Sequence, residues 1–336
     1  MEENKEILQV KDLAVAFQTY RGKVKAVRNV SFALKRGQAL GIVGESGCGK
    51  SVTAHAIMGL LPKENSIIEN GQILWQGQDL VNFQDEDLAK IRGNKIAMIF
   101  QDPMTSLNPL KRIGKHLTEV VMRHRNCSKE EAYDIALDML KKVGITNPEM
   151  RMKRYPHEFS GGMRQRVLIA MALCCEPSLL IADEPTTALD VTIQAQILEL
   201  LKEINEERNM SIILISHDMG VMASTCTKVA VMYGGIIVEE GTTEEIFNSP
   251  KHPYTKSLLE SIPDINKSRH TRLTTIEGTP PSLSKIPKGC PFADRCKYKL
   301  EKCENELPKH IVFSETQKAA CFLAGKFEEG VDENGK

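Results

Sequence analysis

Three glycines, a lysine and a serine between residues 44 and 51 are the first residues whose spacing suggests a chemistry. The segment Gly-Glu-Ser-Gly-Cys-Gly-Lys-Ser follows an apolar run and precedes a helical pattern. Glycines let the backbone curl so that successive N–H groups point at phosphate oxygens, and the following helix adds its positive end. We therefore predict a phosphate-binding loop. A glycine-rich turn without a ligand is the alternative, which the strand and helix on either side disfavour.

Lysine and hydroxyl groups at the end of such a loop have defined uses. Lys50 is expected to reach the β- and γ-phosphates of a nucleoside triphosphate, and Ser51 is expected to ligate Mg²⁺. Cys48 is a candidate redox switch, but the loop uses this position through its backbone, so a passive small side chain is the favoured interpretation. The predicted nucleotide-binding set is Gly44, Glu45, Ser46, Gly47, Cys48, Gly49, Lys50, Ser51, Val52 and Thr53.

A second segment, Leu-Leu-Ile-Ala-Asp-Glu at 179–184, ends an apolar run in two carboxylates. Asp183 is placed to hold Mg²⁺ through water, and Glu184 is placed to polarise an attacking water as a general base. A strand that merely ends in acidic turn residues is the alternative. The phosphate loop makes the catalytic interpretation the stronger one.

The segment Phe-Ser-Gly-Gly-Met-Arg-Gln at 159–165 resembles the signature motif of ATP-binding cassette ATPases. In that family, the serine and glycines open a helix whose N-terminus faces the γ-phosphate held by the opposite subunit. The resemblance implies that Ser160, Gly161 and Gly162 bind ATP across a dimer. It also implies a RecA-like α/β core with an antiparallel β layer and an inserted helical subdomain.

Further cassette elements follow in the family's order. Gln101 after Ile-Ala-Met-Ile-Phe resembles the Q-loop, Ala188-Leu189-Asp190 the D-loop, and His217 the switch histidine. The resemblance implies that Gln101 touches Mg²⁺ and the attacking water while sensing the membrane subunit. It also implies that His217 bonds to the γ-phosphate and that Asp190 contacts the partner's phosphate loop.

The adenine ring is expected to stack on an aromatic side chain of the first β layer. Phe17 occupies the matching place in Leu-Ala-Val-Ala-Phe, and Tyr20 is its rival.

Three longer stretches resemble the ATP-binding subunits of dipeptide and oligopeptide importers. They are GIVGESGCGKS, IFQDPMTSLNP and SPKHPYTKSLLESIP, within a resemblance that covers about residues 5–325. The resemblance implies a second homologous ATPase, two membrane permeases and an extracytoplasmic peptide-binding protein, with this chain peripheral on the cytoplasmic face of the cell membrane. The groove around Gln101 and the helical insert would receive the permeases' cytoplasmic helices.

Other functions remain as alternatives. Nickel importers share much of the pattern, so a nickel or other solute importer is the runner-up. A soluble cassette protein of nucleic-acid metabolism usually has two cassettes or a long coiled coil, and this sequence has one cassette and no heptad run. A regulatory module without turnover is disfavoured by the intact Glu184.

Four cysteines lie close together in the last part of the chain: Cys290, Cys296, Cys303 and Cys321. Clustered thiolates are good ligands for Zn²⁺ and for iron–sulfur clusters. Zinc modules usually contain a close C-x₂₋₄-C pair, which this cluster lacks, so the spacing favours iron–sulfur, with zinc or unligated thiols as alternatives. The cluster also resembles that of some peptide-importer ATPases, which implies a [4Fe-4S] centre.

The expected role of this centre is structural, because a metal compensates for a tail too poor in apolar residues to bury much core. Redox sensing is the alternative. The other cysteines are expected to be packing residues: Cys127, Cys174, Cys175 and Cys226.

These site residues need elements to position them. Apolar runs at 38–44, 95–100, 178–183 and 211–216 alternate with helical segments, which predicts an α/β core with a mostly parallel sheet. Residues 5–35 and 71–76 predict an antiparallel β layer, and three helical stretches predict the helical insert at about 104–176.

The predicted domains are a nucleotide-binding domain at 5–250, a loop-rich and proline-rich tail at 251–325, and a disordered end at 326–336. Lys+Arg and Asp+Glu both number 44, so the chain lacks the basic excess typical of nucleic-acid binding. The start has no apolar core of a signal peptide, and no run reaches the ~18 residues that span a bilayer, so a cytosolic protein is expected.

Overall fold

A computed structural model describes residues 5–20, 22–102, 106–186, 189–262 and 276–327. The chain packs as two compact units, each assembled from separate stretches. Unit 1 comprises Met1–Ile7, Leu34–Ala39 and Asp79–Ile215, and unit 2 comprises Leu8–Ala33, Leu40–Gln78 and Ser216–Lys336.

The core of unit 1 contains three parallel strands in the order β6, β7, β8, with bounds Ile96–Ile99, Leu179–Asp183 and Ser211–Ser216. Every residue of β7 and β8 is buried, as expected for strands covered on both faces. The strands predicted from these three apolar runs, and their parallel arrangement, are confirmed.

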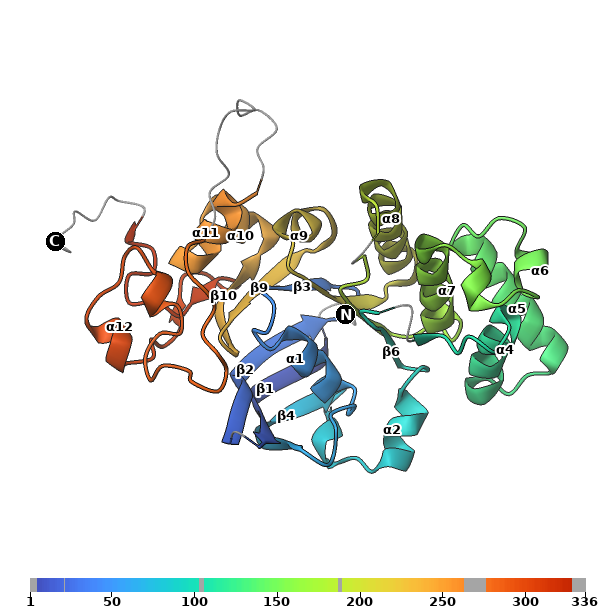
Figure 1. The fold of residues 1–336 in the computed structure, drawn as a ribbon, viewed down its shortest axis with the longest axis horizontal. Coiled ribbons are helices and arrows are strands. Elements are labelled where there is room, and N and C mark those ends of the chain that lie inside the picture. The colour runs from blue at the N-terminus through green and yellow to red at the C-terminus, as the bar shows by residue number, and fades with distance from the viewer. Residues whose placement is uncertain (1–4, 21, 103–105, 187–188, 263–275, 328–336) are drawn as a thin grey trace. The chain divides into compact units, whose positions relative to one another are not determined.

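Helices α4 (Ile113–His124), α5 (Lys129–Lys142) and α7 (Gly161–Leu173) pack against one another in unit 1, as the green group of Figure 1 shows. Helix α5 buries Ala132, Ala136 and Leu140, spaced four residues apart on one face. The predicted helical insert is confirmed in its described part. The other helices of this unit are η1 (Leu80–Asn82), α2 (Asp85–Ile91), α6 (Pro148–Arg151), η2 (Pro156–Glu158) and α8 (Val191–Arg208).

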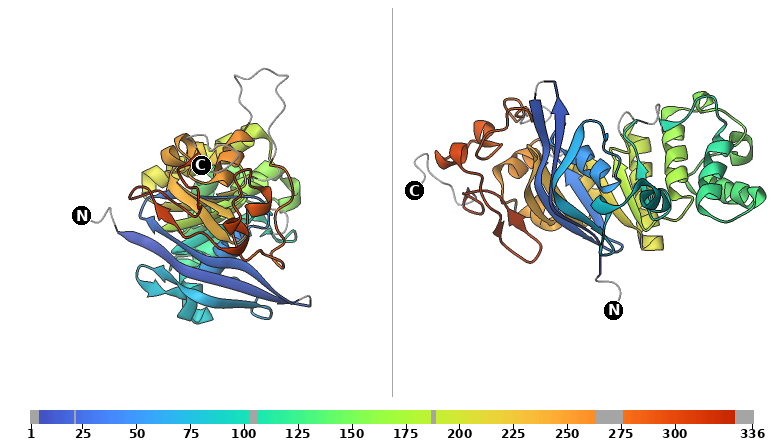
Figure 2. Two further views of the ribbon diagram at one scale, coloured as in Figure 1. Left: turned by 90° about the vertical axis from the view of Figure 1, so that its left-hand side faces the viewer. Right: turned by 90° about the horizontal axis from the view of Figure 1, so that it is seen from below.

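Unit 2 contains the predicted antiparallel β layer. Strands β1 (Glu6–Thr19), β2 (Gly22–Lys35) and β4 (Ser66–Trp75) lie in the order β2, β1, β4, and Figure 2 shows them side by side. β1 pairs antiparallel with β4, with a register shift after Lys11. Short β5 (Gln78–Asp79) continues this sheet.

Unit 2 also contains a second group of paired strands. It includes β3 (Ala39–Val43), which precedes the phosphate loop, and two short strands from the end of the chain. Strand β3 pairs in parallel with β9 (Lys228–Tyr233), which pairs antiparallel with β10 (Ile236–Thr242). Two short tail strands extend it, β12 (Lys318–Ala319) against β10 and β11 (Ile311–Val312) against β12. The helices of this unit are α1 (Lys50–Ile57), α9 (Met219–Thr225), α10 (Thr243–Asn248), α11 (Pro253–Glu260), η3 (Ala293–Arg295) and α12 (Lys302–Asn305).

Two aromatic residues of the tail pack against strand β9. Tyr254 and Phe292 are buried, and their ring centroids lie 5.2 Å apart. Tyr233 of β9 completes the cluster, 4.5 Å from Tyr254 and 5.3 Å from Phe292. Aromatic residues that are widely spaced in sequence thus gather against one strand, which composition alone does not predict.

The predicted disordered end at 326–336 falls almost wholly outside the described residues, which stop at Phe327, a buried residue. Among the residues that are described, no helix combines the length and the apolar character needed to cross a membrane.

Candidate active site

The loop that is predicted to bind phosphate connects β3 to α1 within unit 2. A Cβ atom at Gly44 would lie 2.1 Å from the Met232 carbonyl oxygen, and one at Gly49 would lie 2.5 Å from the Ala26 carbonyl oxygen. Gly49 also has a φ of 106°, a left-handed value that L side chains rarely adopt. Glycine is therefore required at both ends of the loop.

Lys50 lies folded over this loop and is buried. Its ammonium donates to the carbonyl oxygens of Gly44 at 2.6 Å and Glu45 at 3.0 Å. This arrangement holds a positive charge at the centre of a tight backbone turn, which fits a phosphate group. Thr53, by contrast, directs its hydroxyl to the Gly49 carbonyl oxygen at 3.0 Å and supports the first turn of α1.

Cys48 is buried inside the loop, and burial raises the pKa of its thiol despite the nearby Lys50. A protonated thiol is a poor nucleophile, which favours the passive interpretation.

The structure brings Gln101 and Glu184 together in unit 1. The Gln101 side-chain amide donates to the Glu184 carboxylate at 2.9 Å. Glu184 has a φ of 46° and donates its N–H to the Ile215 carbonyl oxygen at 3.0 Å. A left-handed non-glycine residue directly after a buried strand is typical of functional sites. Asp183, its neighbour, is buried at the end of β7.

The signature segment opens α7, as the resemblance implies. The Ser160 hydroxyl caps this helix by accepting the Met163 N–H at 3.4 Å. Asp190 caps α8 in the same way, accepting the Ile193 N–H at 2.9 Å. A Cβ atom at Gly162 would lie 3.0 Å from Ile193, so the starts of these two helices lie against each other. Ala188 lies outside the described residues.

His217 follows β8 and is exposed. Asp218 fixes the turn beside it, donating its N–H to Ser216 and accepting the Gly220 N–H at 2.7 Å to cap α9. Of the two adenine candidates, Phe17 is half-buried on β1 and Tyr20 is 90 % exposed.

The four tail cysteines line one narrow pocket of about 20 Å³ in unit 2, together with His252 and Phe292. Burial is the main cause that raises the pKa of Cys290 to about 11 and of Cys321 to about 12, and the neighbouring thiols act in the same direction. None of the nine cysteines is in a disulfide. Within the described ranges, however, no three His, Cys, Asp or Glu side chains are arranged to hold a metal ion.

One set of contacts was missed by the sequence analysis. Arg295 of the tail forms an ion pair with Glu45 of the phosphate loop, and Tyr254 accepts a hydrogen bond from the Glu45 N–H. No local pattern connects residues so far apart in sequence. In the sequence, Tyr254 stood out only as part of the stretch SPKHPYTKSLLESIP.

Two family descriptions match the chain: residues 27–187 match "ABC transporter", and residues 238–303 match "Oligopeptide/dipeptide transporter, C-terminal region". The dipeptide transport ATP-binding protein DppD of Bacillus subtilis is 53% identical over 319 residues, which cover 94% of both chains. The oligopeptide transport ATP-binding protein OppD of Escherichia coli is 51% identical over 94% of this chain and 93% of its own. The chain belongs to the ATP-binding subunits of peptide ABC transporters.

Solved structures agree with the cassette part of this assignment. The dimeric structure of MJ0796, a bacterial ABC transporter cassette, has a TM-score of 0.63 at 28% identity and covers 70% of this chain. A post-hydrolysis state of the same cassette bound to ADP and Pi has a TM-score of 0.64. The predicted α/β cassette fold and the ATPase class of this peptide-transporter subunit are confirmed.

Proposed function

We propose that this chain binds and hydrolyses ATP to drive the uptake of dipeptides or oligopeptides through partner permeases. The observation that carries the proposal is the match of both parts of the chain, cassette and C-terminal region, to relatives named for peptide transport. Import of nickel or another solute is the alternative.

The proposed chemistry assigns a role to each part. The phosphate loop and Lys50 bind the triphosphate, and Ser51, Gln101 and Asp183 would hold Mg²⁺, which would supply neutralisation of the triphosphate charge. Glu184 takes a proton from the attacking water. The Gln101 amide donates to this carboxylate and so fixes the orientation of the Glu184 side chain.

The remaining residues complete the nucleotide site. His217 bonds to the γ-phosphate and keeps the water aligned. Phe17 stacks on adenine, with Tyr20 as the alternative. Ser160, Gly161, Gly162 and Asp190 serve the ATP of the opposite subunit, so turnover requires a dimer. Two helix N-termini that lie against each other in unit 1 support this role.

Replacing Glu184 by Gln tests the catalytic assignment. The amide cannot accept the proton, so we expect ATP turnover by the assembled transporter to fall about 10²–10⁴-fold while ATP binding persists. Uptake of a labelled dipeptide into membrane vesicles should fall in parallel. Unchanged ATP turnover would refute the general-base role, and ATP-driven uptake of Ni²⁺ without peptide uptake would support the alternative solute.

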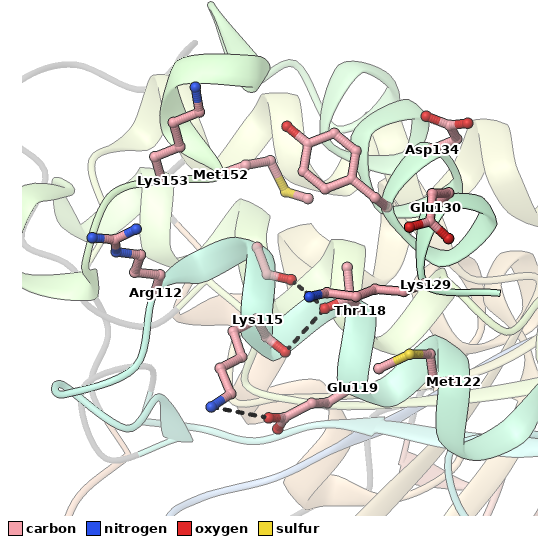
Figure 3. Close-up of a pocket in the computed structure, with 12 residues that line it drawn as sticks. Arg112, Lys115, Thr118, Glu119, Met122, Lys129, Glu130, Asp134, Met152 and Lys153 are labelled. Atoms are coloured by element: carbon pink, nitrogen blue, oxygen red, sulfur yellow. Dashed lines mark hydrogen bonds and ion pairs between the residues drawn. The ribbon is translucent and has the colours of Figure 1, made fainter.

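The proposed partners are a second homologous ATPase, two permeases and an extracytoplasmic peptide-binding protein, with this chain on the cytoplasmic face of the membrane. A pocket of about 720 Å³ in unit 1, drawn in Figure 3, supports permease docking. Its wall includes the apolar side chains of Met122 and Met152. Lys115 and Glu119 on α4 also line it and contribute one positive and one negative charge. Flexible methionines beside mixed charges suit a partner's amphipathic helix.

Charge reversal at this pocket tests the docking surface. We expect Lys115→Glu combined with Lys153→Glu to lower recovery of the permeases in affinity purification from membranes, without changing ATP binding. Lys202→Glu, on the exposed side of α8, is the matched control. Full permease recovery with the double variant would exclude this pocket as the docking site.

We further propose that the four tail cysteines hold a [4Fe-4S] cluster. The support is that Cys290, Cys296, Cys303 and Cys321 line one pocket with mainly apolar walls. The side chains as they stand form no site for a single metal ion, so ligation requires them to turn toward a shared centre. Anaerobic purification followed by iron, sulfide and zinc assays identifies the group, and stoichiometric zinc without iron would refute the cluster.

A further inference from the structure

Arg295 connects the cysteine-bearing tail to the phosphate loop. Its guanidinium binds the Glu45 carboxylate through both oxygens, with Nη1–Oε2 at 2.6 Å and Nη2–Oε1 at 3.0 Å. The Arg295 side chain is only 6% exposed. Two-point binding of a carboxylate by a buried guanidinium fixes orientation as well as charge.

Arg295 is itself held firmly. Nε donates to the Glu277 carbonyl oxygen at 2.9 Å, Nη2 to the Ile276 carbonyl oxygen at 3.1 Å, and Nη1 to the Tyr233 hydroxyl at 3.0 Å. With the two bonds to Glu45, these contacts account for all five N–H donors of a guanidinium. The Arg295 guanidinium therefore cannot rotate without breaking several hydrogen bonds.

The tail also holds the backbone of the same loop residue. The Glu45 N–H donates to the hydroxyl of buried Tyr254 at 3.0 Å, and the Glu45 carbonyl oxygen accepts from Lys50 at 3.0 Å. Side chain, N–H and carbonyl of Glu45 are thus all engaged. A cavity of about 420 Å³ lies beside these contacts, walled by loop residues 45–48, by 233–234 and by tail residues 280–283.

We propose that the C-terminal tail is part of the nucleotide site, and that Arg295 is a positioning residue that holds the phosphate loop in its ATP-binding geometry through Glu45. The physical reason is twofold. The guanidinium neutralises a carboxylate that would otherwise repel the triphosphate, and it fixes the residue whose carbonyl group positions Lys50. The inference rests on the proposed binding of ATP at this loop.

The test is equilibrium titration of the full chain with MgATP, in variants whose iron content and thermal unfolding are also measured. Arg295→Gln leaves the Glu45 carboxylate uncompensated, and we expect the Kd for ATP to rise about tenfold. Arg295→Lys keeps the positive charge but loses the two-point contact with the carboxylate. Its Kd for ATP should therefore lie between those of the wild type and Arg295→Gln. Lys299→Gln removes a positive charge from the same tail, where Lys299 pairs with Glu304 at 2.6 Å, and should leave the Kd unchanged.

A double variant separates positioning from folding. If Arg295 acts by compensating Glu45, then Glu45→Gln combined with Arg295→Gln should bind ATP more tightly than Arg295→Gln alone. If Arg295 only stabilises the tail, the second substitution should bring no recovery, and that result overturns the inference.

The failure of the two proposals can be told apart. Wild-type protein that does not bind ATP refutes the proposed function. Wild-type protein that binds ATP, with the same Kd in Arg295→Gln, refutes only the role of Arg295. If Arg295→Gln does not fold, Arg295→Lys provides the test instead. A Kd for ATP equal to that of the wild type in Arg295→Lys would then refute the inference.

Discussion

Single residues in this protein owe their chemistry to a few backbone and side-chain contacts. Glu184 keeps a left-handed backbone because its N–H bonds to Ile215, and its carboxylate is oriented by Gln101. Asp183, one residue earlier, stays within the buried strand. Two adjacent carboxylates therefore occupy different environments, which suits different roles.

A histidine outside the site gives a prediction at the same scale. His116 on α4 bonds through Nε2 to the Asn108 carbonyl oxygen at 3.1 Å, and burial lowers its pKa below the ordinary 6.5. Between the lowered pKa of His116 in the folded chain and its ordinary pKa of 6.5 in the unfolded chain, the unfolded chain binds more protons. The stability contribution of neutral His116 is complete above pH 6.5 and is lost as the pH falls through its folded-state pKa.

We therefore expect the free energy of unfolding to decrease below about pH 6.5, and to decrease less steeply in His116→Gln, whose amide can still donate to Asn108. Denaturant unfolding at a series of pH values measures both slopes. Identical slopes would mean that His116 does not titrate differently in the folded protein.

At the scale of elements, the starts of two helices in unit 1 carry residues that we propose to act on ATP. Ser160 caps α7 and Asp190 caps α8, and each polar side chain satisfies an N–H that the helix itself leaves without a partner. Ser160 and Gly161 are exposed at this helix start, where the proposed function places the phosphate of the opposite subunit's ATP.

Two neighbouring glycines of this turn should behave differently. A Cβ atom at Gly161 meets nothing within 4 Å, whereas one at Gly162 meets Ile193 at 3.0 Å. Alanine is favoured over glycine in a helix by about 0.5–1 kcal/mol, so Gly161→Ala should unfold at the same or a higher temperature than wild type. Gly162→Ala should unfold at a lower temperature than Gly161→Ala.

ATP turnover of the assembled transporter should nevertheless fall in both glycine variants, because each adds a methyl group at the helix start that we propose to bind the ATP of the opposite subunit. Thermal unfolding and ATPase assays on the same preparations make the comparison. Full ATPase activity in Gly161→Ala would contradict the proposed role of the α7 N-terminus.

At the scale of the whole molecule, the last part of the chain is built into unit 2. Strand β12 pairs with β10, and Lys318 forms an ion pair at 2.9 Å with Glu240, a carboxylate that is 4% exposed. Phe292 packs against Tyr233 and Tyr254, and Arg295 reaches the phosphate loop. A change in the tail is therefore expected to reach the nucleotide site.

The proposed cluster gives the prediction at this scale. Anaerobically purified protein should contain about four iron and four sulfide per chain. Replacing Cys303 by Ser should lower the iron content and the unfolding temperature, because three ligands hold a cluster less well than four. Cys127→Ser, which alters a cysteine far from the pocket in sequence, is the control. Equal iron in both variants would exclude Cys303 as a ligand.

The fold class followed from the sequence, which also supplied the residues that we propose for the nucleotide site. The phosphate loop, the acidic pair and the signature each lie within a few residues, and their strands and helices follow from local periodicity, so no distant contact is needed to recognise them. The sequence also showed that four cysteines are close along the chain, but not whether their side chains converge.

Tertiary structure alone decided the contacts between distant residues. No local pattern relates the residues that these contacts bring together. They are the hydrogen bond between Gln101 and Glu184, the common pocket of the four cysteines, and the hydrogen bonds of Arg295 and Tyr254 to Glu45. The aromatic cluster of the tail escaped prediction for the same reason. Composition averages apolar residues over a segment, whereas burial depends on which of them the fold gathers in one place.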